Sequence, residues 1–197
     1  MQGNRKTIRL KNYDYSQEGA YFVTICVKNR QCLLGKIINN KMALNNIGET
    51  VEFTWLDLPN HNKNIELDHF VIMPNHIHGI INIVGAGSQP ALNQNNISIN
   101  NIPDNCKILI DHKIKRAGLE PAPTCDHGLS EIIRQFKTFS ARRVNKINNI
   151  SNNGLWQRNF YERIIRDQHD LNRIYEYIDN NPVNWESDEN NIKNKNP

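Results

Sequence analysis

The sequence predicts an α+β fold in which an antiparallel β-sheet is flanked by α-helices, and three observations predict it. Residues 21–28, YFVTICVK, alternate two sets of side chains, as a strand with two differently lined faces does. Two short apolar runs flank Asn39-Asn40, which is typical of a hairpin. Residues 129–147 and the segment from Asp170 to about Asn180 instead repeat apolar side chains at helical spacing.

The segment after the first strand predicts a hairpin followed by a helix. The hairpin, LLGKIINNKMAL at 33–44, turns at Asn39-Asn40, because asparagine tolerates the left-handed backbone that a tight turn needs. The helix extends over 46–58 and is stopped by Pro59. Its apolar residues form one stripe: Ile47, Val51, Trp55 and Leu58.

The run from Glu66 to Val84 predicts two strands joined by a bend at Met73-Pro74-Asn75. A proline donates no ladder hydrogen bond, so it does not fit inside a central strand. The second strand carries His76 and His78, which project to the same side because side chains alternate along a strand. Two imidazoles aimed at one point suit a divalent metal ion, although they also suit a solvated sheet face.

The histidine pair alone is a weak signal. Zinc hydrolases, cupins and phosphodiesterases also contain two histidines separated by one residue. Such sites need a further carboxylate, histidine or cysteine, and none stands at a recognisable spacing from His76 and His78.

Residues 85–127 interrupt the pattern. They are rich in Gly, Asn and Pro and have no periodicity, which predicts a flexible insertion in a surface loop. The insertion contains the basic stretch HKIKRAG from His112. We expect that a short Gly/Ser linker in place of 88–110 would preserve folding and activity, unless CKILI forms a strand of the core.

The helix at 129–147 has an apolar face and a basic face. The core-facing residues are Leu129, Ile132, Ile133, Phe136 and Ser140. The basic residues are Arg134, Lys137, Arg142 and Lys146. Such a face is either solvated or in contact with nucleic-acid phosphates.

The helix that begins at Asp170 ends before Pro182 and also presents two faces. Its core stripe consists of Leu171, Ile174, Tyr175 and Ile178, and a neighbouring face carries Asp170, Arg173, Tyr177 and Asn181. Tyr175 therefore has a packing role, and Tyr177 has none so obvious. The residues after Trp185 are rich in Asn and Lys and predict a frayed tail.

Length and composition predict one domain with a proper core. The chain has 197 residues, of which 38% are hydrophobic, and a net charge of +4 that suits a polyanion without requiring one. We expect the domain to cover 1–182, with the insertion at about 85–127 and a polar tail at 183–197. No apolar run approaches about 18 residues, so no membrane association is expected. Four cysteines without a C-x-x-C pair predict reduced thiols and a cytoplasmic protein.

Four segments together resemble one protein family. They are RLKNYDYSQEGAYFVTICVKNR (9–30), ELDHFVIMPNHIHGIINIV (66–84), GLSEIIRQFKTFSARRVN (128–145) and WQRNFYERIIRDQHDLNRIYEYIDNNPV (156–183). The combination of the histidine pair with YI-x-x-NPV is specific. The chain resembles the single-tyrosine HUH transposases of bacterial insertion sequences, and within them the REP-associated tyrosine transposases.

This resemblance implies a ferredoxin-like antiparallel sheet with helices packed on it. It implies that His76 and His78 are metal ligands, that Tyr177 is the nucleophile, and that the metal is Mg²⁺ or Mn²⁺. Many members of the wider family have a glutamine four residues after the tyrosine as third ligand. Asn181 stands at that position here, so a shorter amide would have to reach the ion.

The implied activity is metal-dependent cleavage and strand transfer of single-stranded DNA through a covalent 5′-phosphotyrosine. The implied partner is DNA with hairpin or inverted-repeat structure, bound in the bacterial cytoplasm by a monomer or homodimer. The bases would stack on aromatic residues such as Tyr13, Tyr15 and Phe160, unless these pack in the core. The basic helix 129–147 would grip the hairpin phosphates.

Three alternatives remain open. A non-catalytic, domesticated DNA-binding protein of the same fold need not keep His76, His78 and Tyr177 together. A replication initiator or relaxase shares the chemistry but usually carries helicase or other extra domains, for which 197 residues leave no space. A zinc hydrolase fits least.

Overall fold

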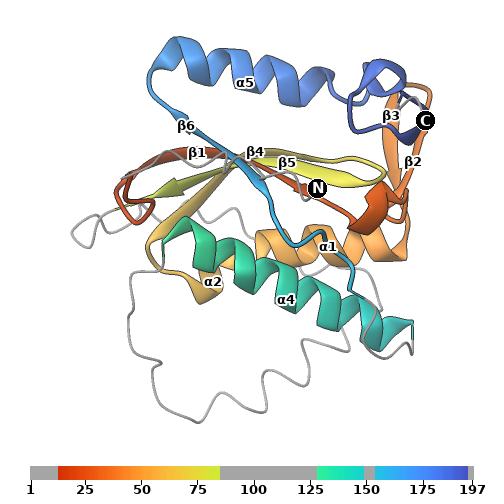
Figure 1. Ribbon diagram of the computed structural model, residues 1–197, viewed down its shortest axis with the longest axis horizontal. Helices are drawn as coiled ribbons and strands as arrows, with labels where there is room; N and C mark the ends of the chain where they lie inside the picture. The colour runs from red at the N-terminus through yellow and green to blue at the C-terminus, as the bar shows by residue number, and fades with distance from the viewer. Residues whose placement is uncertain (1–12, 85–127, 149–153, 195–197) are drawn as a thin grey trace, which may run out of the picture.

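Four strands form one antiparallel sheet with the order β4-β5-β1-β6 (Figure 1). The computed structural model describes residues 13–84, 128–148 and 154–194. The four strands are β1 (Gly19–Cys26), β4 (Ile65–Ile72), β5 (His76–Ile83) and β6 (Tyr161–Ile165). The insertion at 85–127 lies outside the described residues, and so does the prediction made for it.

Both predicted turns are confirmed. A separate hairpin consists of β2 (Gly35–Ile38) and β3 (Lys41–Leu44). Asn39 and Asn40 join its strands with φ values of 50° and 60°, in the left-handed region. The bend at Met73-Pro74-Asn75 separates β4 from β5, so Pro74 lies outside both strands.

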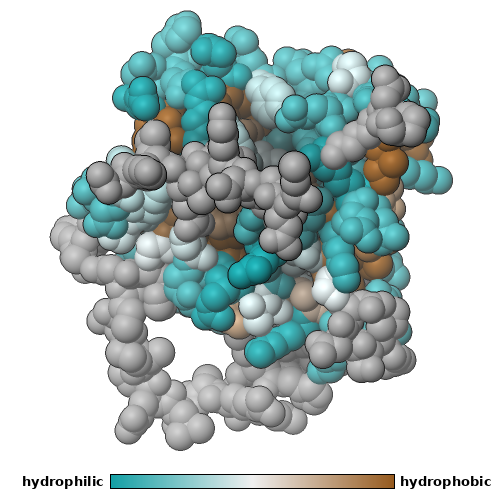
Figure 2. Space-filling model, in the orientation of Figure 1, coloured by the Kyte–Doolittle hydropathy of each residue, from teal (hydrophilic) through white to brown (hydrophobic). Residues whose placement is uncertain are grey.

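The helices cover both faces of the sheet and enclose its apolar side chains, and hydrophilic residues predominate on the described surface seen in Figure 2. Helices α1 (Asn46–Leu56) and α4 (Leu129–Ile147) lie together on one face, and α5 (Gln168–Asn180) lies on the other (Figure 1). Without the β2–β3 hairpin, the short helix after α1 and α5, the remaining strands and α-helices follow the order β-α-β-β-α-β of a ferredoxin-like fold. The predicted fold class is therefore confirmed, and so is the predicted helix at 129–147.

The predicted role of Pro59 is wrong. Helix α1 ends at Leu56, and Pro59 lies in the first turn of a short helix, α2 (Leu58–His61). A proline fits a first turn because the N–H that it lacks would have no partner within the helix. Pro59, which the sequence suggests as a stop signal, therefore lies inside the first turn of the next helix.

Strand β5 divides its side chains between two cores. Ile77 and Ile81 belong to the larger core, which contains Trp55 of α1 and Phe136 of α4. Ile80 belongs to the smaller core, in which Phe22 of β1 packs against Ile174 and Ile178 of α5. Because side chains alternate along a strand, His76 and His78 share the α5 face with Ile80.

Gly79 allows α1 to approach β5 closely. A Cβ atom at Gly79 would lie 2.5 Å from Cζ2 of the buried Trp55 ring and 3.1 Å from the Phe70 Cβ. We expect Gly79→Ala to lower the free energy of unfolding by about 1–3 kcal/mol, the cost of overpacking a core. Urea unfolding measures this change. Gly154→Ala is the matched control, because a Cβ there meets nothing within 4 Å. Equal stability of the two variants would contradict the prediction.

The chain after Trp185 is folded up to Asn194, so the prediction of a frayed segment is wrong there. It forms the short 3₁₀ helices η3 (Trp185–Ser187) and η4 (Ile192–Asn194). The backbone carbonyl of Asn190 accepts a hydrogen bond from Asn75 Nδ2 at 2.9 Å. The carbonyl of Glu189 accepts one from Arg30 Nη1, also at 2.9 Å. These bonds attach the segment to the end of the sheet where β5 begins.

No helix among the described residues is long and apolar enough to cross a membrane.

Candidate active site

The rings of His76 and His78 lie side by side under α5, with centroids 4.5 Å apart. His76 Nδ1 lies 2.8 Å from Asn75 Oδ1 and must donate, because a carbonyl oxygen only accepts. Its Nε2 atom therefore carries a free lone pair. His78 Nδ1 forms a hydrogen bond with Thr24 Oγ1 at 2.8 Å, in which either atom can be the donor. Fixing Nδ1 so that Nε2 faces the site is how proteins orient histidine ligands of metals.

Tyr177 reaches this pair from α5. Its hydroxyl oxygen lies 3.2 Å from His78 Nε2, and its ring contacts the Phe22 ring edge-on at 6.0 Å. The side chain remains 43% exposed. Tyr175 points elsewhere and donates a hydrogen bond to Asp68 Oδ2 at 2.7 Å. The two tyrosines thus differ as their positions on the helix predict.

Two buried atoms beside the histidines have no hydrogen-bond partner in the described part of the chain. They are His76 Nε2 and Asn181 Oδ1. Asn181 follows Tyr177 by one helical turn and is buried. An unpaired buried polar atom is costly, so two together point to a group that would satisfy both.

Asp188 is the acidic residue that sequence reasoning missed. Its Oδ2 atom lies 3.7 Å from His76 Nε2. Ligand atoms of Asp188, His76 and His78 all lie within 4.8 Å of one another, close enough to surround one metal ion. The Asp188 side chain is only 5% exposed. The site therefore offers two imidazole nitrogens, a carboxylate and an amide oxygen.

Asn75 connects His76 to the segment that carries Asp188. Its Oδ1 accepts from His76 Nδ1, while its Nδ2 donates to the Asn190 carbonyl at 2.9 Å. The backbone N–H of Asn190 in turn donates to Asp188 Oδ1 at 2.6 Å. Asp188 Oδ2 is left directed at His76. The spacing of residues in the sequence does not predict this contact, because the contact depends on how the chain after α5 packs against the sheet.

Burial keeps both histidines neutral. It lowers the pKa of His76 to about 3, with help from the nearby Arg30 charge, while the Asn181 side chain acts in the opposite direction. Burial also lowers the pKa of His78 well below its usual range, and His76 adds to the effect. Neutral imidazoles keep the lone pairs that a metal requires.

The phenol of Tyr177 is held in its protonated form. Burial raises its pKa most, and the negative charges of Asp188 and Glu189 raise it further, although Asn181 lowers it. A cation between these residues would offset the negative charges and favour the phenolate.

We expect the metal-free protein to lose stability as the pH falls below about 6.5, because the unfolded chain then binds protons that the folded His76 refuses. Stability rises with pH wherever the unfolded state binds more protons. The loss therefore develops between about pH 6.5 and pH 3, with a slope near 1.4 kcal/mol per pH unit for one histidine. Urea unfolding in EDTA at several pH values measures it. His76→Gln should have a shallower slope than the parent protein, and an unchanged slope would contradict the assignment.

The basic residues of α4 lie on the opposite face of the sheet from the histidines and Tyr177 (Figure 1). Arg134 pairs with Glu131, with Nε 2.6 Å from Oε2. Lys137 is partly buried and donates to the carbonyls of Gln157 and Asn159 at 3.1 and 3.0 Å. Arg142 and Lys146 are exposed. The structure therefore does not bring these four residues together with the site.

The predicted base-stacking aromatics pack in the protein. Tyr13, Tyr15 and Phe160 are partly buried against the larger core.

Comparison with known proteins gives one close relative. An uncharacterised protein of Haemophilus influenzae is 40% identical over 189 residues, which cover 94% of this chain and 92% of that protein. The chain belongs to the same family as that protein. No family model matches the sequence.

Among solved structures, this chain shares its fold with one described as a REP-associated tyrosine transposase bound to a REP hairpin. The TM-score is 0.52 at 16% identity, over 90% of this chain and 74% of the other. A second structure, described as a candidate transposase from Deinococcus radiodurans, covers 87% of this chain and 95% of its own, with a TM-score of 0.43 and 15% identity. The first likeness supports the fold assignment made from the strand order.

Proposed function

We propose that this protein is a metal-dependent transposase-type enzyme that cleaves single-stranded DNA and transfers the cleaved strand. The observation that carries the proposal is the position of the Tyr177 hydroxyl, 3.2 Å from His78 Nε2 in a cluster of potential metal ligands. A nucleophile beside such a cluster is what phosphodiester chemistry requires. The shared fold with a transposase bound to a REP hairpin supports DNA with a hairpin as the partner.

The residues at the site fit a divalent metal ion. His76 Nε2 and Asn181 Oδ1 are buried without a hydrogen bond within the described residues, and an ion would satisfy both. Nitrogen donors combined with oxygen donors admit Mn²⁺ more readily than Mg²⁺, which prefers oxygen. We propose His76, His78 and Asp188 as ligands, with Asn181 completing the set. When bound, the ion would neutralise the phosphate and polarise it for attack.

The chain itself supplies the nucleophile. The Tyr177 oxygen forms a bond to phosphorus and loses its proton to water on the exposed side of the ring. The bond from phosphorus to the preceding 3′ oxygen breaks, and that oxygen takes a proton to become a free 3′-hydroxyl. The product is a 5′-phosphotyrosine. A second 3′-hydroxyl can attack it in the reverse sense, which rejoins the strand without ATP.

Covalent adduct formation tests the proposal. The oligonucleotide carries an imperfect hairpin taken from the DNA beside the gene and a label at its 3′ end, because the 3′ fragment stays on the protein. Incubation with Mn²⁺ should give a labelled protein band on a denaturing gel, and EDTA should remove it. Hairpin binding without an adduct under any divalent ion would favour the alternative, a non-catalytic DNA-binding protein of the same fold.

We expect Asp188→Asn and Asn181→Ala each to weaken Mn²⁺ binding to the DNA-free protein. Removal of a residue that only supports a metal ligand lowers metal affinity roughly 10–100-fold. Because the Asp188 carboxylate is charged and would bind the ion directly, Asp188→Asn should lower the affinity by more than this. Calorimetric titration with Mn²⁺ measures both affinities. Glu186→Gln is the matched control, since Glu186 is an acid on the same segment whose side chain is 79% exposed. Unchanged affinity in Asp188→Asn would leave Asn181 as the third ligand.

A further inference from the structure

A groove leads away from Tyr177 between the edge strand β6 and helix α5, and it continues around the outer edge of β6, where Tyr15, Glu162 and Ile164 line it. Three adjoining cavities of about 450, 330 and 360 Å³ compose it, and Tyr161 lines all three. The first contains His78 and Tyr177, the second lies between Tyr177 and Arg163, and the third extends to Arg166. The groove is thus open at one end to the proposed reaction centre.

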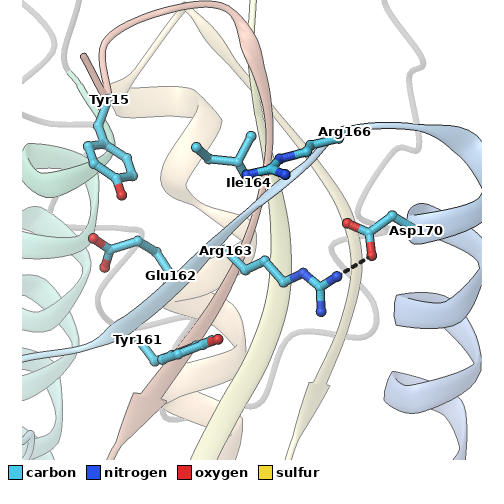
Figure 3. Close-up of a pocket in the computed structure, with 7 residues that line it drawn as sticks. All are labelled: Tyr15, Tyr161, Glu162, Arg163, Ile164, Arg166 and Asp170. Carbon is cyan, nitrogen blue, oxygen red and sulfur yellow. Dashed lines mark hydrogen bonds and ion pairs between the residues drawn. The ribbon is translucent and has the colours of Figure 1, made fainter. Parts of the chain in front are cut away.

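Three arginines line this groove: Arg163 on β6, Arg166 just after β6, and Arg173 on α5. Arg163 is paired with Asp170 at 2.6 Å, a contact drawn in Figure 3. Arg166 and Arg173 are exposed and have no ion-pair partner among the residues that the structure describes. Glu162 is buried and points toward Tyr15, away from Arg163 (Figure 3). Two arginines without an ion-pair partner among the described residues therefore line the groove, together with the acidic Glu162 and Glu189, and these arginines suit the phosphates of a polyanion.

Tyr161 lies in the same row of the sheet as His78. It pairs with Thr24 in the β1–β6 register, and Thr24 pairs with His78 in the β1–β5 register. Tyr161 and His78 therefore lie two strands apart in one row, roughly 10 Å, on the face covered by α5. The Tyr161 side chain is 43% exposed. An exposed ring beside a basic groove is the usual platform for an unpaired base.

We propose that the single DNA strand leaves the Tyr177 site along the β6–α5 groove, with a base stacked on Tyr161 and phosphates beside Arg173 and Arg166. The inference rests on the proposed function, since it supplies the path of that enzyme's substrate. It also separates two surfaces. The groove holds the unpaired strand, while the basic face of α4, on the other side of the sheet, is left for paired DNA.

Binding of an unstructured oligonucleotide tests the path without cleavage. The parent is Tyr177→Phe, titrated against a fluorescent single strand that cannot form a hairpin and followed by anisotropy. Tyr161→Leu should weaken binding roughly tenfold, and Tyr161→Phe should retain the parent affinity because stacking needs only the ring. Arg166→Gln and Arg173→Gln should each lower the slope of log K against log salt by about 0.7, the share of one phosphate contact on a single strand.

Lys36→Gln is the matched control, because it removes one positive charge from the exposed part of β2, outside the groove. It should leave both affinity and salt slope unchanged. Parent-like binding by Tyr161→Leu and both arginine variants would overturn the inference. So would weakened binding by Arg142→Gln and Lys146→Gln alone, which would place the strand on α4.

Adduct formation by the protein with Tyr177 intact separates this inference from the proposed function. If adducts form and the groove variants bind like the parent, the proposed path of the strand is wrong and the proposed enzymatic function stands. If the groove variants lose binding and no adduct forms, the groove is a binding site and the proposed cleavage is wrong.

Discussion

Tyr177→Phe is expected to abolish the covalent protein–DNA adduct, a loss of at least about 10³-fold, because it removes the oxygen that would bond to phosphorus. The fold should be unchanged, since the side chain is 43% exposed and its ring can keep the edge-on contact with Phe22. Hairpin affinity should also persist, because it depends mainly on phosphate contacts. The measurement is the labelled-adduct gel with Mn²⁺, run beside anisotropy on the same DNA.

Tyr175→Phe is the matched control for this variant. It removes one hydroxyl from the same helix, two residues away, and breaks the hydrogen bond to Asp68. The bond to Asp68 directs the Tyr175 hydroxyl away from His78 and raises its pKa to about 12. Tyr175→Phe should therefore keep the adduct. An adduct that persists in Tyr177→Phe would move the nucleophile to another tyrosine, with Tyr161 the nearest candidate in the groove.

The metal affinity of Tyr177→Phe should not fall. The Tyr177 hydroxyl forms a hydrogen bond with His78 Nε2, the atom that would also bind an ion through its lone pair. Removing the hydroxyl leaves that lone pair free, so Mn²⁺ should bind at least as tightly as before. This outcome separates a nucleophile from a metal ligand, because loss of a ligand would weaken binding.

Local patterns in the sequence carry most of the fold. The alternation at 21–28 and the helical stripe at 129–147 each arise within one element, so a single segment is enough to predict them. Strand β6, YERII at 161–165, was not predicted from the sequence. Its charged residues break any apolar alternation, and its identity as a strand comes from pairing with β1, far away in the chain.

The same distinction applies to the site. His76, His78 and Tyr177 belong to a strand and a helix whose own periodicities show which way they point. Asp188 belongs to a polar segment that looks like a tail, and only its hydrogen bonds through Asn75 bring it to His76. Lys137 shows the opposite case. The sequence suggests a cation available for DNA, whereas its Nζ donates to backbone carbonyls near the start of β6.

The second large effect is expected from the histidines. His78→Ala and His76→Ala should each abolish strand cleavage while changing hairpin affinity by less than about threefold, because the ion acts on the reacting phosphate and most binding comes from other phosphates. His69→Ala is the matched control: His69 is 44% exposed and contacts Asp179 on α5, at 2.9 Å, away from the site. It should retain cleavage.

A readout without DNA guards against loss of the fold. An ion that binds only the folded protein stabilises it by about 2.7 kcal/mol at 100 times its dissociation constant. Mn²⁺ should therefore raise the melting temperature of the EDTA-treated parent protein and of His69→Ala. Mn²⁺ should leave the melting temperature of His78→Gln nearly unchanged, even though that variant keeps a polar side chain in the buried position.

Agreement between these two measurements decides whether the histidines hold a metal or only support the sheet. A structural role would lower the melting temperature of the variants with and without Mn²⁺ and leave the increment intact. If the histidines are metal ligands, the variants lose the rise in melting temperature that Mn²⁺ causes, whatever their melting temperature without the ion. Cleavage that continues after EDTA treatment would contradict the proposed metal dependence. Tyr177 would then act with the neutral imidazoles of His76 and His78 alone.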